Sequence, residues 1–274
     1  MTVIKEIFGT DKAIIAMAHF PPLPGQPQYD AAGGVAALRA SLERDLEILV
    51  SSGVDGVMFC NEGDRPYTTS AGPEATATMA AVISTLTPGI GIPFGVDILW
   101  DPCAAIALGH AVGASFVREV FTGTYAGDFG FWEPETAAAL RYRRALGAEN
   151  LKLFFNITAE FASAVAPRSI GLTARSVLLS SLPDALCVSG VVTGTGVDAE
   201  MLQEAKDAVG DAVAVIANTG VRPETVGTLL GIADACIVGT AFKRDGDTWN
   251  PVEADRVDRL LKAARESGHW TPAS

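Results

Sequence analysis

The chain has 274 residues, of which 49% are hydrophobic and 19% are charged, so it can bury one large core or two ordinary ones. Its formal net charge of −12 argues against nucleic acid or an acidic membrane surface as a partner, because both are themselves anionic. No apolar run reaches the roughly 18 residues that a membrane span needs, and no signal peptide is recognisable, so a cytoplasmic protein without membrane insertion is expected.

Apolar, strand-like runs alternate with amphipathic, helix-like segments along the whole chain. Buried strands are predicted at residues 13–19, 56–60, 93–100, 115–122, 151–157, 185–190, 212–220 and 233–242. A helix is predicted after each strand, starting near residues 35, 73, 103, 134, 168, 198, 223 and 251. Eight strand-helix units without a large insertion predict a single (β/α)8 TIM barrel that occupies residues 1–274 as one domain.

Side chains that can do chemistry follow the first two strands. His19 ends the first strand before a proline-rich turn, and it is either a general acid/base or a structural partner of that turn. The second strand leads into a polar cluster that contains Asn61, Glu62 and Asp64. Glu62 and Asp64 can serve as a base or a metal ligand, or they can be solvated, turn-forming carboxylates. We also treat Asn61 as a candidate ligand-binding residue.

The third and fourth strands carry charges inside apolar runs. Asp97 needs a partner, because an unpaired buried carboxylate is costly. Arg118 and Glu119 are neighbours in the fourth strand, and one of them should point inward because strand side chains alternate. Asp97 and Arg118 are therefore predicted to form a buried ion pair, which either orients a substrate or fills the barrel interior.

The segment between the fourth and fifth strands is rich in glycine and aromatic residues. Residues 123–132 are a candidate lid, with Tyr125 and Asp128 closing over a substrate, and a mobile surface loop is the alternative. In the fifth strand Lys152 could form a Schiff base if it were desolvated. It lies four residues before Asn156, a candidate substrate ligand, and a position this deep or helix-facing disfavours such chemistry.

Glycine and threonine end the last three predicted strands. Their N–H groups and hydroxyls can hold an anion, and α/β barrels commonly bind phosphate with the loops after strands seven and eight. A turn explains any one of these ends, but three in succession favour a phosphate site and a barrel of the ribulose-phosphate-binding type. The candidate phosphate ligands are Thr193, Gly194, Asn218, Thr219, Gly220, Gly239 and Thr240, with Lys243 as a counter-charge.

The sequence does not identify a cofactor. The cysteines lack CxxC spacing and are expected to be buried thiols of a reducing compartment: Cys60, Cys103, Cys187 and Cys236. No GxxxxGK[ST] or HExxH motif supports ATP hydrolysis or zinc protease chemistry. No metal site is predicted from ligand spacing, although Glu62, Asp64 or Asp97 could hold a divalent ion.

Four segments resemble the BtpA/SgcQ family. They are His19-Phe-Pro-Pro-Leu-Pro-Gly25, the run from residue 53 into Asn61-Glu-Gly-Asp-Arg-Pro66, Val117-Arg-Glu-Val-Phe-Thr-Gly123, and residues 238–246 with Asn250-Pro251. The likeness covers nearly the whole chain and implies a TIM barrel. The family's name implies a role in photosystem I biogenesis for a cyanobacterial member, which is not general because other members belong to bacteria without photosystems. The family has an Asp-Val-His-like sequence where this chain has Asn156-Ile-Thr158, so the resemblance does not carry that acid/base pair to this chain.

Two classes of function are compatible with these patterns. The first is an enzyme that acts on a small sugar phosphate or nucleoside phosphate by acid/base isomerisation, aldol-type cleavage or glycosidic lysis. Its expected catalytic residues are His19, Glu62, Asp97 and Arg118. The second is a non-catalytic assembly or stability factor, and either protein could be a homo-oligomer. Polar residues at the ends of at least five strands favour the enzyme, because an assembly factor has no need of costly buried charge there.

Overall fold

The structure is a computed structural model that describes residues 1–190, 192 and 196–273. Within this part of the chain, eight parallel strands form a closed barrel in the order β1-β2-β3-β4-β7-β9-β10-β11, and β11 pairs with β1. They are β1 (Ala13–His19), β2 (Gly56–Cys60), β3 (Phe94–Asp97), β4 (Phe116–Glu119), β7 (Lys152–Asn156), β9 (Ala185–Val188), β10 (Ala214–Ala217) and β11 (Ala235–Val238). The predicted TIM barrel is confirmed.

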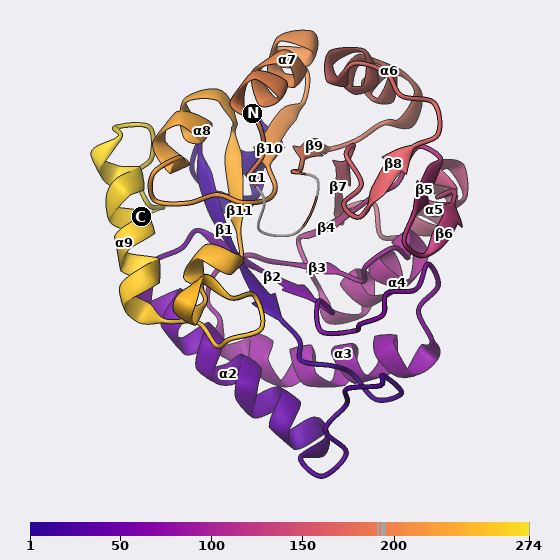
Figure 1. Cartoon of the computed structure of the whole chain (residues 1–274), viewed down its shortest axis with the longest axis vertical. Helices are drawn as coiled ribbons and strands as arrows, with labels where there is room; N and C mark the ends of the chain where they lie inside the picture. The colour runs from indigo at the N-terminus through magenta and orange to yellow at the C-terminus, as the bar shows by residue number, and fades with distance from the viewer. Residues whose placement is uncertain (191, 193–195, 274) are drawn as a thin grey trace.

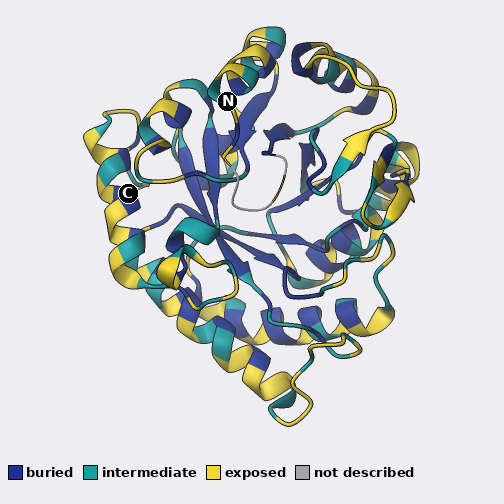
Figure 2. Ribbon diagram, viewed as in Figure 1, coloured by how far each residue is buried: buried dark blue, intermediate teal, exposed yellow. Residues whose placement is uncertain are grey.

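Helices surround the barrel, as Figure 1 shows. They are α2 (Gly34–Ser52), α3 (Pro73–Leu86), α4 (Pro102–Val112), α5 (Thr136–Ala145), α6 (Ile170–Ser181), α7 (Ala199–Val209), α8 (Val226–Ile232) and α9 (Ala254–Glu266). Short 3-10 turns are η1 (Thr87–Gly89), η2 (Thr240–Phe242) and η3 (Arg244–Gly246). In Figure 2 the barrel strands are buried, while each helix shows one buried and one exposed side, as an amphipathic helix on a core should. No described helix is long and apolar enough to cross a membrane.

A short helix that the sequence patterns did not predict closes the amino-terminal end of the barrel. This helix, α1 (Val3–Phe8), buries Ile4 and Phe8 against the barrel interior. The interior there is filled by aromatic side chains, and the rings of Phe116 and Phe154 stack with centroids 4.6 Å apart. Six residues are too few to show a helical period. This packed end leaves the carboxyl ends of the strands as the place for chemistry.

The segment expected to be a lid forms a β-hairpin. Strands β5 (Tyr125–Gly127) and β6 (Gly130–Trp132) pair antiparallel, and β8 (Ala162–Ala164) adds a third strand. Gly130 has a φ of 91°, which explains why glycine stands at this turn. Trp132 packs edge-on against Trp100 in the loop after β3, at a centroid distance of 5.1 Å. The small sheet is therefore anchored beside the barrel mouth.

Candidate functional site

Side chains from the carboxyl ends of the strands meet at the barrel mouth. On β4, Phe116 lies in the interior cluster, so strand alternation directs Arg118 to the same side and Glu119 to the other. A small cavity of about 40 Å³ is lined by Met17, His19, Glu62, Arg118, Glu160, Asn218, Thr219, Gly220, Gly239 and Thr240. Eight of the candidate residues predicted from separate strand ends thus line one opening.

His19 is held as a neutral imidazole. Burial lowers the pKa of His19 well below its ordinary value, and the positive charges of Lys243 and Arg118 lower it further, against a hydrogen bond with the Thr248 backbone. Its Nδ1 is buried and has no hydrogen-bond partner among the described residues. A neutral imidazole with an unused nitrogen can accept a proton near neutral pH.

The absence of a side chain at Gly239 makes room for the His19 imidazole. An added Cβ at Gly239 would lie 3.1 Å from Cε1 and 3.3 Å from Nε2 of His19. The first of these separations is tighter than most real contacts, so a side chain here would push the imidazole aside. Gly239 was singled out for its strand-end position, and the structure adds this close approach as a second reason for glycine.

Asp97 and Arg118 form the expected buried ion pair. Arg118 Nη2 lies 2.9 Å from Asp97 Oδ2, and the two side chains are 9% and 0% exposed. Burial raises the pKa of Asp97 to about 6, although the Arg118 guanidinium opposes this shift. Asp97 Oδ1 and Arg118 Nε are buried without hydrogen-bond partners among the described residues. The ion pair therefore has one hydrogen-bond acceptor, Asp97 Oδ1, and one donor, Arg118 Nε, with which a ligand can bond.

Two further residues at the mouth were not predicted from the sequence. The hydroxyl of Tyr67 donates to Glu62 Oε1 at 3.2 Å, and the Tyr67 ring contacts those of Trp100 and Phe161. Glu160 is 9% exposed and lines the mouth beside Glu62 and Arg118. Glu160 lies just after the fifth strand of the barrel, so a search of each strand-end loop for carboxylates would have found it. Tyr67 had no comparable signal.

A hydrogen-bonded chain of neutral side chains borders the mouth at β7, β9 and β10. Asn218 Nδ2 donates to Ser189 Oγ at 2.7 Å, and Ser189 Oγ donates to Asn156 Oδ1 at 3.1 Å. Thr158 Oγ1 also donates to Asn156 Oδ1, at 3.2 Å. Asn218 Oδ1 is buried and has no partner among the described residues. This oxygen can accept a hydrogen bond from a ligand, whereas Asn156 is already engaged.

Other predicted residues hold the fold together. Asn61 accepts a hydrogen bond from Leu99 N at 2.8 Å and donates to Asp64 Oδ2 at 3.0 Å. Asp64 Oδ1 in turn accepts from Leu23 N at 2.8 Å, so it fixes the proline-rich turn. These contacts agree with the turn-forming alternative for Asp64.

Three charged candidates do not line the mouth cavity. Lys243 is 2% exposed, and its Nζ lies 2.7 Å from Asp45 Oδ2 on α2, which neutralises the charge that was expected to meet a phosphate. Lys152 pairs with Glu6 of α1 at 2.8 Å, at the closed end of the barrel, so it does not reach the mouth as a Schiff-base lysine would have to. Asp128 is exposed at the turn between β5 and β6 and does not line the mouth cavity.

Two of the predicted phosphate ligands, Thr193 and Gly194, lie outside the described residues. The cysteines are unpaired and three are buried, but Cys103 is exposed in the first turn of α4, so the expectation of four buried thiols is wrong there. Among the described residues, no group of three or more His, Cys, Asp and Glu side chains is arranged to hold a metal ion.

A larger cavity of about 650 Å³ opens beside the mouth, between the loops after β10 and β11. It shares Gly220, Gly239 and Thr240 with the mouth cavity. Gly220 has a φ of 62°, a conformation that favours glycine. At the turn η2 the N–H groups of Phe242 and Lys243 already donate to the carbonyls of Gly239 and Thr240, which leaves those of Thr240 and Ala241 as candidate anion donors.

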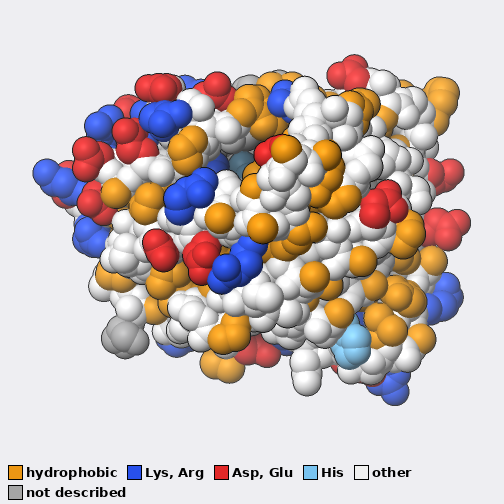
Figure 3. Space-filling view, turned by 90° about the horizontal axis from the view of Figure 1, so that it is seen from below, with side chains coloured by type: hydrophobic (Ala, Val, Ile, Leu, Met, Phe, Trp, Pro, Cys, Tyr) orange, Lys and Arg blue, Asp and Glu red, His pale blue; other side chains and the backbone are white. Residues whose placement is uncertain are grey.

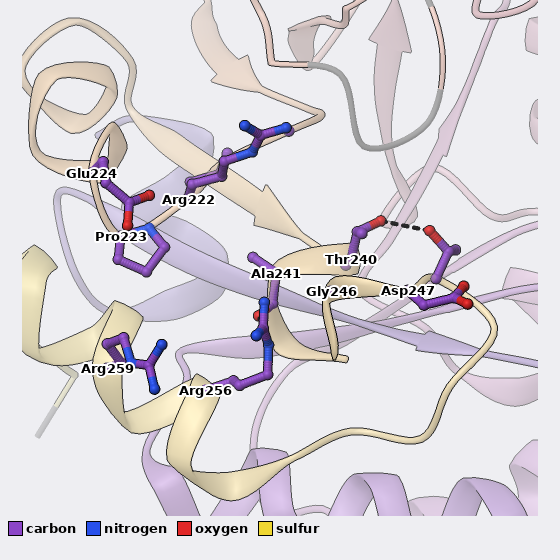
Figure 4. A pocket seen from close by; sticks show the side chains of 13 residues that line it. Arg222, Pro223, Glu224, Thr240, Ala241, Gly246, Asp247, Arg256 and Arg259 are labelled. Atoms are coloured by element: carbon purple, nitrogen blue, oxygen red, sulfur yellow. Dashed lines mark hydrogen bonds between the residues drawn. The ribbon is translucent and has the colours of Figure 1, made fainter. Parts of the chain in front are cut away.

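Three arginines line this larger cavity. Figure 4 shows Arg222 on the loop after β10, with Arg256 and Arg259 across the cavity on α9. Arg256 Nε donates to the Ala241 carbonyl at 3.0 Å, which fixes its guanidinium beside η2. Acidic and basic side chains are interspersed on the face seen in Figure 3. The strand-end pattern did not predict these arginines because they lie beyond the strand ends, although Arg222 is only two residues after Gly220.

Known proteins resemble this chain in sequence and in fold. It is 45% identical to the sgc region protein SgcQ of Escherichia coli strain K12, with 96% of this chain and 97% of that protein covered. It is 26% identical to the photosystem I biogenesis protein BtpA of a Synechocystis species, with 95% and 91% covered. The fold resembles that of thiamine phosphate pyrophosphorylase from Pyrococcus furiosus, with a TM-score of 0.56, 13% identity, and 93% and 96% of the chains covered. Residues 10–266 match the BtpA family, and the chain therefore belongs to this family.

Proposed function

We propose that this protein is an enzyme that acts on a small phosphorylated metabolite by acid/base chemistry of the isomerase, lyase or glycosidase type. One observation carries the proposal: the arginine-lined cavity shares Gly220, Gly239 and Thr240 with the mouth cavity that contains His19. A phosphate held by the arginines would place the adjoining carbon atoms over the mouth. The barrel supports this arrangement because β11, which leads into the arginine-lined cavity, is the neighbour of β1, which ends at His19.

Local groups are needed to hold the phosphate, because the chain as a whole is acidic. The guanidinium groups of Arg222, Arg256 and Arg259 offer planar sets of N–H donors that suit phosphate oxygens. N–H groups of Gly220 and η2, with the Thr240 hydroxyl, would complete the site. Lys243 has no part in this proposal, because Asp45 already neutralises it.

The mouth offers the groups that a proton transfer requires. Neutral His19 would take a proton at Nδ1, and a carboxyl group of Glu62 or Glu160 would return one. Arg118 would stabilise negative charge that develops on a substrate oxygen, while Asp97 holds its guanidinium in place. The three reaction types share these steps, and the substrate decides among them.

The mouth favours this enzyme over a non-catalytic assembly factor. Burial of Asp97 and Arg118 with unused polar atoms lowers stability, and an assembly surface gains nothing from such groups inside a cavity. The name of the Synechocystis relative describes the biogenesis role of that protein, and nothing at this mouth requires the role here.

Phosphate affinity provides the experiment. Replacing Arg222 with methionine should weaken binding of inorganic phosphate about tenfold, since a charge-assisted hydrogen bond contributes about 1.5–3 kcal/mol. Isothermal titration calorimetry measures this change. The matched control is Arg141→Met on the exposed face of α5, which removes the same charge far from the cavity and should leave the affinity unchanged. Equal affinities for the wild type and the Arg222 variant would show that phosphate is bound elsewhere.

A further inference from the structure

A second large cavity lies across the barrel mouth from the arginines. It has a volume of about 590 Å³ and is formed at the carboxyl ends of β4, β7 and β9, together with β8, α6 and α7. In the closed strand order these three strands lie opposite the β11 and β1 pair. Nothing in the proposed acid/base chemistry uses this cavity.

The floor of this second cavity is apolar. Tyr125, Ile157, Ala159 and Ile170 are buried there, each 8% exposed or less. The Tyr125 hydroxyl already donates to the Thr122 carbonyl at 3.1 Å and its ring stacks on Trp132, so Tyr125 contributes apolar ring atoms to the cavity wall. Such a floor favours a flat, apolar group over an ion, which would lose its hydration without compensation.

Arg168 is the one positively charged residue among the described residues that line the second cavity. Arg168 is exposed, and it lies close enough to Tyr125 for its charge to act on the pKa of that hydroxyl. A guanidinium in this position can stack on an aromatic ring or meet an acidic substituent. The cavity is therefore unlike the arginine-lined one, where three guanidinium groups surround a space edged by glycine and threonine.

The hydrogen-bonded chain connects this cavity to the mouth. Ser189 lines the second cavity and accepts a hydrogen bond from Asn218, which lines the mouth. Their side chains are only 2.7 Å apart, so a ligand over the mouth lies next to the second cavity. The arginines, the mouth and the apolar floor thus form three consecutive sections of one surface.

We propose that the second cavity holds an aromatic or heteroaromatic ring of the substrate. This inference rests on the proposed function, and it narrows the substrate to a phosphorylated sugar that carries a ring. The phosphate lies against the arginines, the sugar lies over His19 and Arg118, and the ring lies on Tyr125 and Ile157. The bond that joins the sugar to the ring then lies between the two cavities.

Two ligands that differ only in the ring test this substrate class. Ribose 5-phosphate and phenyl β-ribofuranoside 5-phosphate are titrated into the wild type by calorimetry. The phenyl compound should bind at least about tenfold more tightly, because burying a phenyl-sized apolar group contributes about 1.5–3 kcal/mol. The variant Thr173→Trp fills the cavity from the α6 wall and should remove this advantage while ribose 5-phosphate binds as before.

A matched control lies one residue away on the same helix. Leu172 is 55% exposed and does not line the cavity, so Leu172→Trp should leave both affinities unchanged. If Thr173→Trp does not fold, Ala166→Trp on the exposed loop before α6 fills the same cavity from its rim. If the folded Thr173→Trp or Ala166→Trp variant still binds the phenyl compound more tightly than ribose 5-phosphate, the ring does not bind in this cavity.

The outcomes distinguish a failure of the ring site from a failure of the proposed function. If ribose 5-phosphate and the phenyl compound bind the wild type equally, the ring site is overturned and the phosphate site stands. If neither compound binds and inorganic phosphate also fails, both proposals are overturned. A phenyl advantage that is lost in the filling variant and kept in Leu172→Trp supports the ring site.

Discussion

Replacing Arg118 with methionine is expected to lower the free energy of unfolding by about 3–5 kcal/mol at pH 7.5, as removal of one partner from a buried ion pair does. Arg118 and Asp97 are 9% and 0% exposed, so Asp97 would be left as a buried carboxylate without its cation. Urea denaturation of the two proteins, followed by circular dichroism, measures the difference.

The pH dependence of this loss has a defined sign. In the wild type, burial already raises the pKa of Asp97 to about 6, above its unfolded value near 4, even with Arg118 opposing the shift. The folded state therefore binds the proton more tightly than the unfolded state, and stability from this group falls as the pH rises from about 4 to 6. Without Arg118 the folded pKa rises further, so lowering the pH from 7.5 to 5.5 should recover part of the lost stability.

A second substitution provides the control. Adding Asp97→Asn to the Arg118 variant removes the buried charge, and it should restore stability at pH 7.5 and abolish the recovery at lower pH. Arg141→Met, on an exposed part of α5, should change the free energy of unfolding by less than about 0.5 kcal/mol. A loss below about 1 kcal/mol in the Arg118 variant would mean that Asp97 remains solvated or paired without it.

Replacing His19 with alanine should reduce turnover of a phosphorylated substrate at least about 100-fold, as the loss of a general acid/base does. The free energy of unfolding should change by no more than about 1 kcal/mol, because Nδ1 has no partner within the described residues and the hydrogen bond with the Thr248 backbone contributes about that much. Steady-state kinetics with the substrate, together with urea denaturation, measures the two effects. His110→Ala removes an exposed imidazole from α4 and is the matched control.

The pH profile distinguishes a base from a residue that only binds. A base must be unprotonated, so activity should fall on the acidic side as His19 gains a proton. Because burial and the nearby positive charges lower the pKa of His19 well below its ordinary value, this fall should occur at a lower pH than for an ordinary histidine. The acidic limb should be absent from the residual activity of His19→Ala. Unchanged turnover would refute the catalytic role, whereas a joint loss of turnover and stability would assign His19 to the proline-rich turn.

The sequence predicts the barrel well because its signals are local. The strands β1 and β2 have the predicted bounds and the helix α3 begins at the predicted residue, since apolar runs and flanking proline or glycine mark these positions. The mouth is predictable for the same reason. A polar residue that ends a buried strand, or follows it by one or two positions, must lie at the carboxyl end of the barrel, as His19 and Glu62 do.

The residues that sequence reasoning misplaced depend on contacts between distant segments. Lys243 is 198 positions from Asp45, and no local pattern shows that a lysine beside a glycine motif pairs with a distant helix. The ordered hairpin likewise depends on β8, whose three small residues give no strand signal of their own. Arg256 and Arg259 lie on the outer helix α9, which packs against the turn η2, and no motif in the sequence marks this contact with the candidate phosphate site.

A crystal of the protein soaked in inorganic phosphate tests the central claim most directly. We expect tetrahedral density in the arginine-lined cavity, within hydrogen-bond distance of Arg222 and of the turn η2, with the His19 side chain unmoved. The same soak of the Arg222→Met variant should show weaker density or none. Density for phosphate at another part of the barrel, or an empty cavity in the wild type under saturating phosphate, would contradict the proposal that this protein holds its substrate by a phosphate group.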